Sequence, residues 1–332
     1  MKRILKICLY TIALAVVVFM VGCKGNDLPV DDGKLKIVTT IFPEYDWVKQ
    51  IAGDSNNLDI TFLMKNGGDL HSYSPSAEDI LKISSCDMLV YVGGESDKWI
   101  EEILENSVNS NIKTINLMNV LGEKAKEEEL VEGMEDDDHD DHDDHDDHDD
   151  DAELEYDEHV WLSLDNAQLF VKSITENLCA IDSENVGTYK ANCEKYLSQL
   201  DVLDDEYEEV IENSKYKTLI FADRFPFRYL TDDYDLSYYA AFKGCSAEIE
   251  ASFETITFLA NKADELNLPR ILTIDGSDGK IAKTVAATSK NKDRTVYSLD
   301  SLQSVTDNEV QSGKTYIKAM ESNLEILKKA LN

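Results

Sequence analysis

Six histidines carry most of the chemical information in this sequence. Two of them, His71 and His159, stand in polar segments between stretches that are typical of strands and helices. The other four recur at every third position of an acidic run, as His139, His142, His145 and His148. Imidazoles together with carboxylates are ligands for divalent zinc and manganese. The residue types therefore indicate metal binding, although a lone histidine is more often a surface or core side chain.

The acidic run, residues 135–151, contains thirteen Asp or Glu and no basic residue. The whole chain has a formal charge of −35, so these thirteen acids leave −22 for the rest. Such a charge excludes nucleic acid as a general partner, because the protein repels phosphate. Adjacent like charges resist helix formation, so we expect the run to be disordered. It is interpreted as a weak collector of metal ions whose loading rises with pH; the alternative, a solubilising tail, leaves the regular histidines unexplained.

Apolar, β-branched segments alternate with helical patterns through the chain, which predicts an α/β fold of two mostly parallel sheets. The ligand-binding loops of such a fold follow the carboxyl ends of its strands. Expected strands are residues 35–40, 58–63, 87–92, 112–118, 218–222, 235–242, 270–274 and 295–299. Expected helices include residues 45–51, 77–83, 253–265, 279–289 and 314–331.

Between the two α/β regions the pattern predicts two consecutive helices. The first is capped by Asp165 or Asn166, and residues 182–185 cap the second. Apolar side chains recur at steps of three and four from Tyr189 to Val210, which indicates one amphipathic helix of about 28 residues, or roughly 40 Å. The expected organisation is an N-terminal lobe at 35–164 with a disordered loop at 124–156, linker helices at 165–214, and a C-terminal lobe at 215–332.

The N-terminus has the pattern of an export signal, with basic residues before an apolar run that ends at Cys23. Residues 20–23 resemble a lipobox, so we expect a lipoprotein signal at 1–23 with a lipid anchor on Cys23, and a tether at 24–34, outside the cytoplasm. The alternative is an uncleaved membrane anchor. The remaining cysteines allow three disulfide pairings or four free thiols, and are Cys86, Cys179, Cys193 and Cys245.

Two segments around the histidines resemble motifs of one protein family. Residues 67–75 read Gly-Gly-Asp-Leu-His-Ser-Tyr-Ser-Pro, similar to G-x-D-x-H-x-Y-x-P, and residues 157–167 are similar to D-x-H-x-W-L-x-x-x-N-A. Both are motifs of the solute-binding lipoproteins of zinc and manganese ABC importers, the ZnuA/TroA-like cluster. The resemblance extends over the long helix and residues 313–324, and so covers essentially the whole chain after the signal.

The resemblance implies a metal held between the lobes by His71 and His159, with a third histidine or glutamate and a carboxylate from the C-terminal lobe. Counting back from Tyr229 places Arg224 at the third position, and a guanidinium cannot coordinate a cation. Asp223 is the natural substitute, and an alternative role for Arg224 is a pair with an acid in the cleft. Asp300 matches the fourth ligand of the family, with Glu248 and Asp275 in reserve.

The function that we expect is non-catalytic: capture of Zn²⁺ outside the cell and delivery to a membrane permease driven by a cytoplasmic ATPase. The His-Asp-Asp repeat favours zinc, with Mn²⁺ as the alternative, and a monomer is expected. A metallohydrolase in which Glu248 serves as the base is an alternative. It is less favoured because no HExxH pair is present. An adhesin or structural lipoprotein is compatible with the anchor but gives the histidines no role.

Overall fold

A computed structural model describes residues 33–135, 155–246 and 250–332. Contacts divide the chain into two units, Met1–Lys34 and Leu35–Asn332, and the following description concerns the second. Within the described residues, no helix has both the length and the apolar character needed to cross a bilayer. The predictions for the export signal, Cys23, the tether up to residue 32, the four repeated histidines and Glu248 fall outside the described residues.

The first sheet has four parallel strands in the order β2-β1-β3-β4. Its strands are β1 (Leu35–Thr39), β2 (Leu58–Phe62), β3 (Met88–Tyr91) and β4 (Lys113–Asn116). The helices between and after them are α2 (Phe42–Ala52), α3 (Ala77–Ser85), α4 (Lys98–Glu105) and α5 (Leu117–Leu121). β3 is buried along its whole length and β1 at its last three positions, as central strands with helices on both faces require.

The second sheet repeats this arrangement with the order β6-β5-β7-β8, again all parallel. Its strands are β5 (Thr218–Phe225), β6 (Ser237–Lys243), β7 (Arg270–Ile274) and β8 (Thr295–Leu299). Its helices are α8 (Arg228–Asp233), α9 (Phe253–Glu265), α10 (Lys280–Thr288), α11 (Asp307–Gln311) and α12 (Tyr316–Ala330). The predicted two-sheet α/β fold is therefore confirmed.

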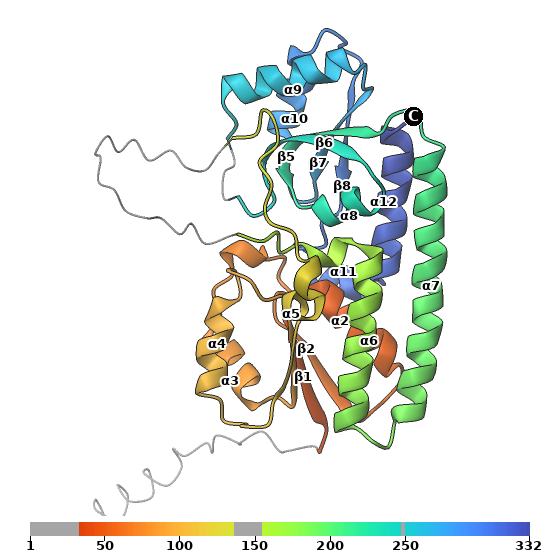
Figure 1. Cartoon of the computed structure of the whole chain (residues 1–332). Helices are drawn as coiled ribbons and strands as arrows, with labels where there is room; N and C mark the ends of the chain where they lie inside the picture. Colours follow the sequence, from red (N-terminus) through yellow and green to blue (C-terminus); the bar gives the residue numbers. More distant parts are fainter. Residues whose placement is uncertain (1–32, 136–154, 247–249) are drawn as a thin grey trace, which may run out of the picture. The chain divides into compact units, whose positions relative to one another are not determined.

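Two helices connect the sheets, α6 (Leu164–Ile181) and α7 (Val186–Glu212). α7 has 27 residues and runs past both sheets, packing against α2 on one side and α12 on the other (Figure 1). Its buried positions follow the predicted stripe from Tyr189 to Ile211. The prediction for the start of α6 was wrong: Ser163 is the N-cap and accepts from the Asn166 N–H, while Asn166 lies one turn inside.

One hydrophobic core extends across both sheets. Its members come from α2, α6, α7, α12, strands of each sheet and the 3-10 turn Val160–Leu162, and they include Trp47, Trp161 and Tyr316. Each sheet has a smaller separate core on another face, under α3 and α4 in the first sheet and under α9 and α10 in the second. A continuous core through the connecting helices resists wide separation of the sheets, because opening it exposes apolar surface to water.

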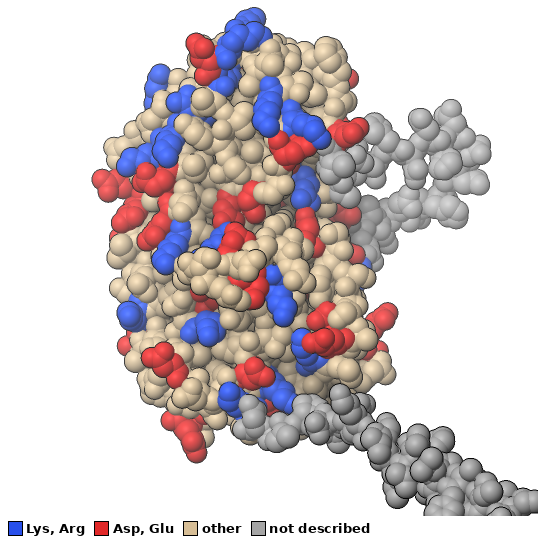
Figure 2. Space-filling model, turned by 180° about the vertical axis from the view of Figure 1, so that it is seen from behind, with Lys and Arg blue, Asp and Glu red and all other residues tan. Residues whose placement is uncertain are grey.

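Residues 125–135, expected to belong to a disordered loop, instead lie along the second sheet (Figure 1). The Glu135 N–H donates to the Ala241 carbonyl and Lys262 pairs with Glu132. On the face shown in Figure 2, acidic and basic side chains are interspersed. The run 135–151 contributes 13 of the 35 net negative charges, and the other 22 belong to the rest of the chain.

Candidate metal centre

His71 is held at the end of the first sheet by a short 3-10 turn, Leu70–Ser72, which follows β2. The Asp69 carboxylate caps this turn by accepting the His71 N–H at 3.0 Å. The ring Nδ1 lies 2.9 Å from the Ser96 hydroxyl and 3.6 Å from Glu158 Oε2. With Nδ1 engaged in this way, Nε2 points toward the second histidine.

His159 is completely buried and has a carboxylate behind it. Asp157 Oδ1 accepts both the backbone N–H of His159, at 2.8 Å, and its ring Nδ1–H, at 2.9 Å. Since Nδ1 carries the proton in this arrangement, Nε2 is free to act as a metal ligand. The neighbouring Glu158 reaches Ser96 over Gly94, where any side chain would collide with the Glu158 carboxylate.

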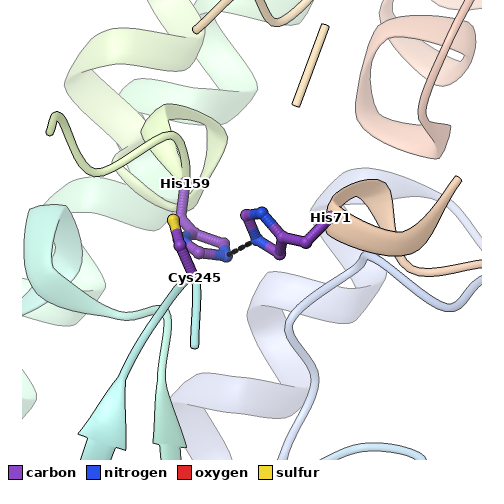
Figure 3. A group of neighbouring side chains, drawn as sticks. All are labelled: His71, His159 and Cys245. Carbon is purple, nitrogen blue, oxygen red and sulfur yellow. Dashed lines mark hydrogen bonds between the residues drawn. The ribbon is translucent and has the colours of Figure 1, made fainter. Parts of the chain in front are cut away.

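The two Nε2 atoms lie 3.2 Å apart and face each other, as Figure 3 shows. Burial and the charge of His159 lower the pKa of His71. Burial also lowers the pKa of His159, but Asp157, Glu128 and Glu158 more than offset it, so the net pKa lies above the ordinary value. The pair therefore binds its first proton on His159 and resists a second, and that proton competes with a metal ion.

Cys245 is the third member of the group and was not predicted from the sequence. Its Sγ and the histidine nitrogens all lie within 4.8 Å of one another (Figure 3). Gly244 lets the loop after β6 approach, since a Cβ there would lie 2.9 Å from His159 Cε1 and 2.9 Å from the Phe225 carbonyl. Burial, with Glu128 and Asp157, raises the pKa of the Cys245 thiol well above its ordinary value. The only sequence signal was its position two residues after a strand.

The predicted carboxylate ligands lie outside this group in the described structure. Asp300 follows β8, pairs with Lys314 at 2.7 Å and accepts the Leu302 N–H. Asp223 accepts from the Thr273 hydroxyl, and Asp275 accepts from Ser301. Asp223 and Asp275 line a cavity of about 640 Å³ at the end of the second sheet, which neither histidine lines. Their role as ligands stays a prediction.

Gln303 is the side chain of the β8 loop that does reach His71. Its Nε2 lies 3.4 Å from His71 Nε2, whereas Asp300, three residues earlier, closes the turn instead. Amide nitrogen and oxygen exchange places by a simple flip, so the Gln303 oxygen can face the same point. The sequence analysis did not select this residue.

Arg224, at the position where the resemblance expects a ligand, pairs with an acid, and that alternative is confirmed. Its Nη2 lies 2.7 Å from Asp69 Oδ2, and its Nη1 donates to the Ser246 carbonyl at 3.3 Å. Asp69 caps the turn of His71, and Ser246 follows Cys245. The guanidinium thus connects the loops on either side of the group.

A cavity of about 320 Å³ opens beside the group and is predominantly acidic. His71 and Cys245 line it together with four carboxylates, those of Glu95, Glu128, Glu155 and Glu158. Lys243 is the one basic residue among its described lining residues. Its negative potential attracts cations and repels anions. Glu155 is the first residue that the structure describes after the gap at 136–154.

No disulfide links the described cysteines: Cys86, Cys179, Cys193 and Cys245 are free thiols. Cys86 and Cys193 are buried among apolar side chains of two cores. The predicted alternative of free, mostly apolar cysteines therefore describes them better than disulfide pairing.

The fold and the paired imidazoles define a class of protein, the two-lobed α/β binding proteins whose ligand site lies where two parallel sheets meet. Within it, the family described as ZnuA, the periplasmic component A of a zinc-uptake complex, matches residues 37–330. The chain belongs to this ZnuA family.

Relatives with described names support the same placement. The zinc-binding lipoprotein AdcA of Streptococcus pneumoniae is 30% identical over 313 residues, which are 93% of this chain but 58% of AdcA. The high-affinity zinc uptake system protein ZnuA of Bacillus subtilis is 30% identical over 300 residues, 90% of this chain and 88% of that protein. This chain therefore spans little more than half of AdcA and most of the Bacillus protein.

Solved structures agree. The Zn(II)-bound ZnuA-like domain of S. pneumoniae AdcA superposes with a TM-score of 0.69 at 28% identity, covering 90% of this chain and 99% of that domain. The metal-dependent lipoprotein YcdH from B. subtilis gives a TM-score of 0.70 at 25% identity, covering 90% of this chain and all of that one.

Proposed function

We propose that this protein captures Zn²⁺ outside the cytoplasm and delivers it to the permease of an ABC importer, without catalysing a reaction. The observation that carries the proposal is the pair of Nε2 atoms, 3.2 Å apart, each on a ring whose Nδ1 faces a carboxylate or hydroxyl. Two imidazole nitrogens bound to one tetrahedral zinc lie about 3.3 Å apart, given Zn–N bonds of 2.0–2.1 Å. The zinc-binding names of AdcA and the Bacillus relative support the same ion.

Zinc is proposed over manganese on the chemistry of these donors. Manganese prefers oxygen ligands, whereas imidazole nitrogen suits zinc. The Asp157 carboxylate beside His159 and the Ser96 hydroxyl beside His71 orient the two rings as ligands before the metal arrives. Asp300 and Asp223 remain predicted ligands for the bound state, and each has to leave its present partner, Lys314 or Thr273, to reach the metal.

Delivery requires that the site release its ion, and the connections between the lobes indicate how far they can move. Trp161 Nε1–H donates to the Ser301 carbonyl and Tyr316 O–H donates to the Trp161 carbonyl, so buried bonds cross between the regions next to His159. With a shared core, these bonds favour small tilts and loop shifts over wide hinge opening. Release then follows from separating one ligand from the others by a few ångströms.

The location and anchoring belong to the same proposal. Residues 1–23 act as the export signal, Cys23 carries the lipid and residues 24–34 form the tether; the lipoprotein name of AdcA supports this assignment. The domain limits proposed above, 35–164, 165–214 and 215–332, apply to the part outside the membrane. The permease and its cytoplasmic ATPase are the expected partners.

The repeated histidines are proposed to collect zinc at several weak sites. The described residues nearest to the repeat in the sequence are Glu135, whose N–H donates to the Ala241 carbonyl, and Glu155, which lines the acidic cavity. A local supply of loosely held zinc raises the concentration at the tight site by proximity.

Equilibrium dialysis of residues 24–332 against Zn²⁺ and Mn²⁺ tests the proposal. We expect one tight zinc site and several weak ones, with weaker binding of Mn²⁺. Changing the four repeated histidines to Asn should abolish the weak zinc sites and keep the tight one. These changes leave Glu135 in place. The four are His139, His142, His145 and His148. Tight zinc binding that survives in the His71→Ala, His159→Ala double variant would refute the site, and metal-dependent hydrolysis of esters or amides would refute the non-catalytic assignment.

A further inference from the structure

We infer that Cys245 supplies the third zinc ligand, as a thiolate, in a His₂Cys site with His71 and His159. This inference rests on the proposed function and assigns one of its ligands. Among the described residues, these three form the sole group of at least three His, Cys, Asp or Glu whose ligand atoms all lie within 4.8 Å of one another. Figure 3 shows Cys245, from the loop after β6, beside the His159 ring, with His71 opposite.

The distances fit one ion with small adjustments. A zinc ion with Zn–N bonds of 2.0–2.1 Å and a Zn–S bond of 2.3 Å holds sulfur and nitrogen about 3.5 Å apart. The Nε2 atoms, at 3.2 Å, are already within about 0.2 Å of the tetrahedral spacing. The sulfur lies at most 4.8 Å from the nitrogens, so it needs to move by about 1.3 Å at most. A change of the Cys245 side-chain rotamer covers such a movement.

The chain is built to bring Cys245 to this point. Gly244 is the residue whose missing side chain lets the loop pass against the His159 ring, 2.9 Å from a hypothetical Cβ. The Cys245 N–H donates to Glu128 Oε1 at 3.3 Å, which fixes the backbone of the loop. Arg224 then holds the next residue, through the Ser246 carbonyl, and Asp69 beside His71.

Arg224 therefore binds two loops of the protein instead of a metal ion. It stands at the position where the resemblance expects a ligand but contacts the loops that carry His71 and Cys245, so the donor missing there is supplied from the loop after the neighbouring strand, β6. When zinc binds, a Zn–S bond replaces the S–H bond, and the thiol proton leaves to solvent. A thiolate also favours zinc over manganese, because soft sulfur ligands select against Mn²⁺.

Cobalt(II) substitution tests this inference, because a thiolate bound to Co²⁺ gives charge-transfer absorption in the near ultraviolet that imidazole and carboxylate do not. The four repeated histidines are changed to Asn first, and the protein is kept reduced. We expect the band in the protein with Cys245 intact, its loss in Cys245→Ser, and its retention in Cys179→Ser, a half-buried thiol on α6. Zinc affinity should fall by about 100-fold or more in Cys245→Ser, beyond the 10–100-fold typical of losing a supporting partner.

The second variant covers a failure of Cys245→Ser to fold. Cys245→His keeps a ligand at the position, so it should restore tight zinc binding without the charge-transfer band. Tight zinc binding with no band in the intact protein overturns the assignment of Cys245 and leaves the proposed function standing. Absence of tight zinc binding in the intact, folded protein overturns both.

Discussion

The carboxylate of Asp157 is the group whose charge should most affect metal affinity without touching the metal. It is 1% exposed, and a single oxygen, Oδ1, accepts both the backbone N–H and the ring Nδ1–H of His159. The change Asp157→Asn keeps an acceptor oxygen at that place and removes only the charge. The orientation of the ring is therefore expected to survive, and the basicity of Nε2 is expected to fall.

The size of the effect follows from this arrangement. Loss of a partner that supports a ligand costs 10–100-fold in metal affinity, which is about 1.4–2.7 kcal/mol. We expect the upper half of this range at pH 8, because water does not reach the buried pair to screen it. Asp157 also raises the pKa of His159 against the lowering effect of burial, so removing its charge lowers that pKa. Protons then compete with zinc at a lower pH in the variant, and the difference in affinity should shrink as pH falls.

Competition titration with a chromophoric zinc chelator at pH 8, 7, 6 and 5.5 measures this prediction, in protein whose four repeated histidines are Asn. Asp182→Asn is the matched control, since Asp182 is also a buried, hydrogen-bonded carboxylate but lies between α6 and α7, outside the metal-binding group. Its zinc affinity should equal that of the parent at every pH. Equal affinities of Asp157→Asn and parent at pH 8, or a gap that widens as pH falls, would show that the carboxylate does not act through His159.

Three further predictions concern stability. Tyr316→Phe leaves the buried Trp161 carbonyl without the donor that now lies 2.7 Å away. This variant should lower the free energy of unfolding by about 1–3 kcal/mol in urea titrations. Tyr45→Phe is the control and should leave the free energy of unfolding unchanged, since the Tyr45 hydroxyl bonds to no described residue. Burial raises the pKa of Asp182, but the hydrogen bonds from Tyr189, Asn57 and Asn185 lower it by more than burial raises it. The net pKa is therefore below the ordinary value. Its contribution is therefore complete above about pH 4 and disappears at lower pH, so Asp182→Asn should destabilise at pH 7 and less at pH 3. Burial raises the pKa of Asp97 to about 7, so its stabilising contribution is complete below about pH 4 and declines as pH rises to 7. Asp97→Asn should therefore reduce the fall in melting temperature between pH 4 and pH 7. An unchanged fall would contradict the assignment.

Local pattern was sufficient to predict most of the regular structure. Buried β-branched runs such as residues 270–274 became β7 without change, and residues 253–265 became α9. The helix α4 was not predicted, and its position is explained by packing: Ile100 is its one buried residue and lies in the core beneath α3. A short helix with so few buried positions has a weak signal in the sequence, and contact with its neighbours decides it.

The sequence by itself indicated that two imidazoles belong to one chemistry, because each lies in a segment that resembles a motif of the same metal-binding family. It also determined the two-sheet α/β class and the long helix between them, since hydrophobic periodicity is a local property. Only the tertiary structure decided which other residues join the histidines. Asp300 and Asp223 stand at suitable places along the chain but bond to Lys314 and Thr273, while Cys245 reaches the His159 ring through a space that Gly244 leaves open. Cys245 stands 86 positions after His159 and 174 positions after His71 in the sequence. Whether residues so far apart come into contact depends on how the sheets pack, and no local pattern encodes that.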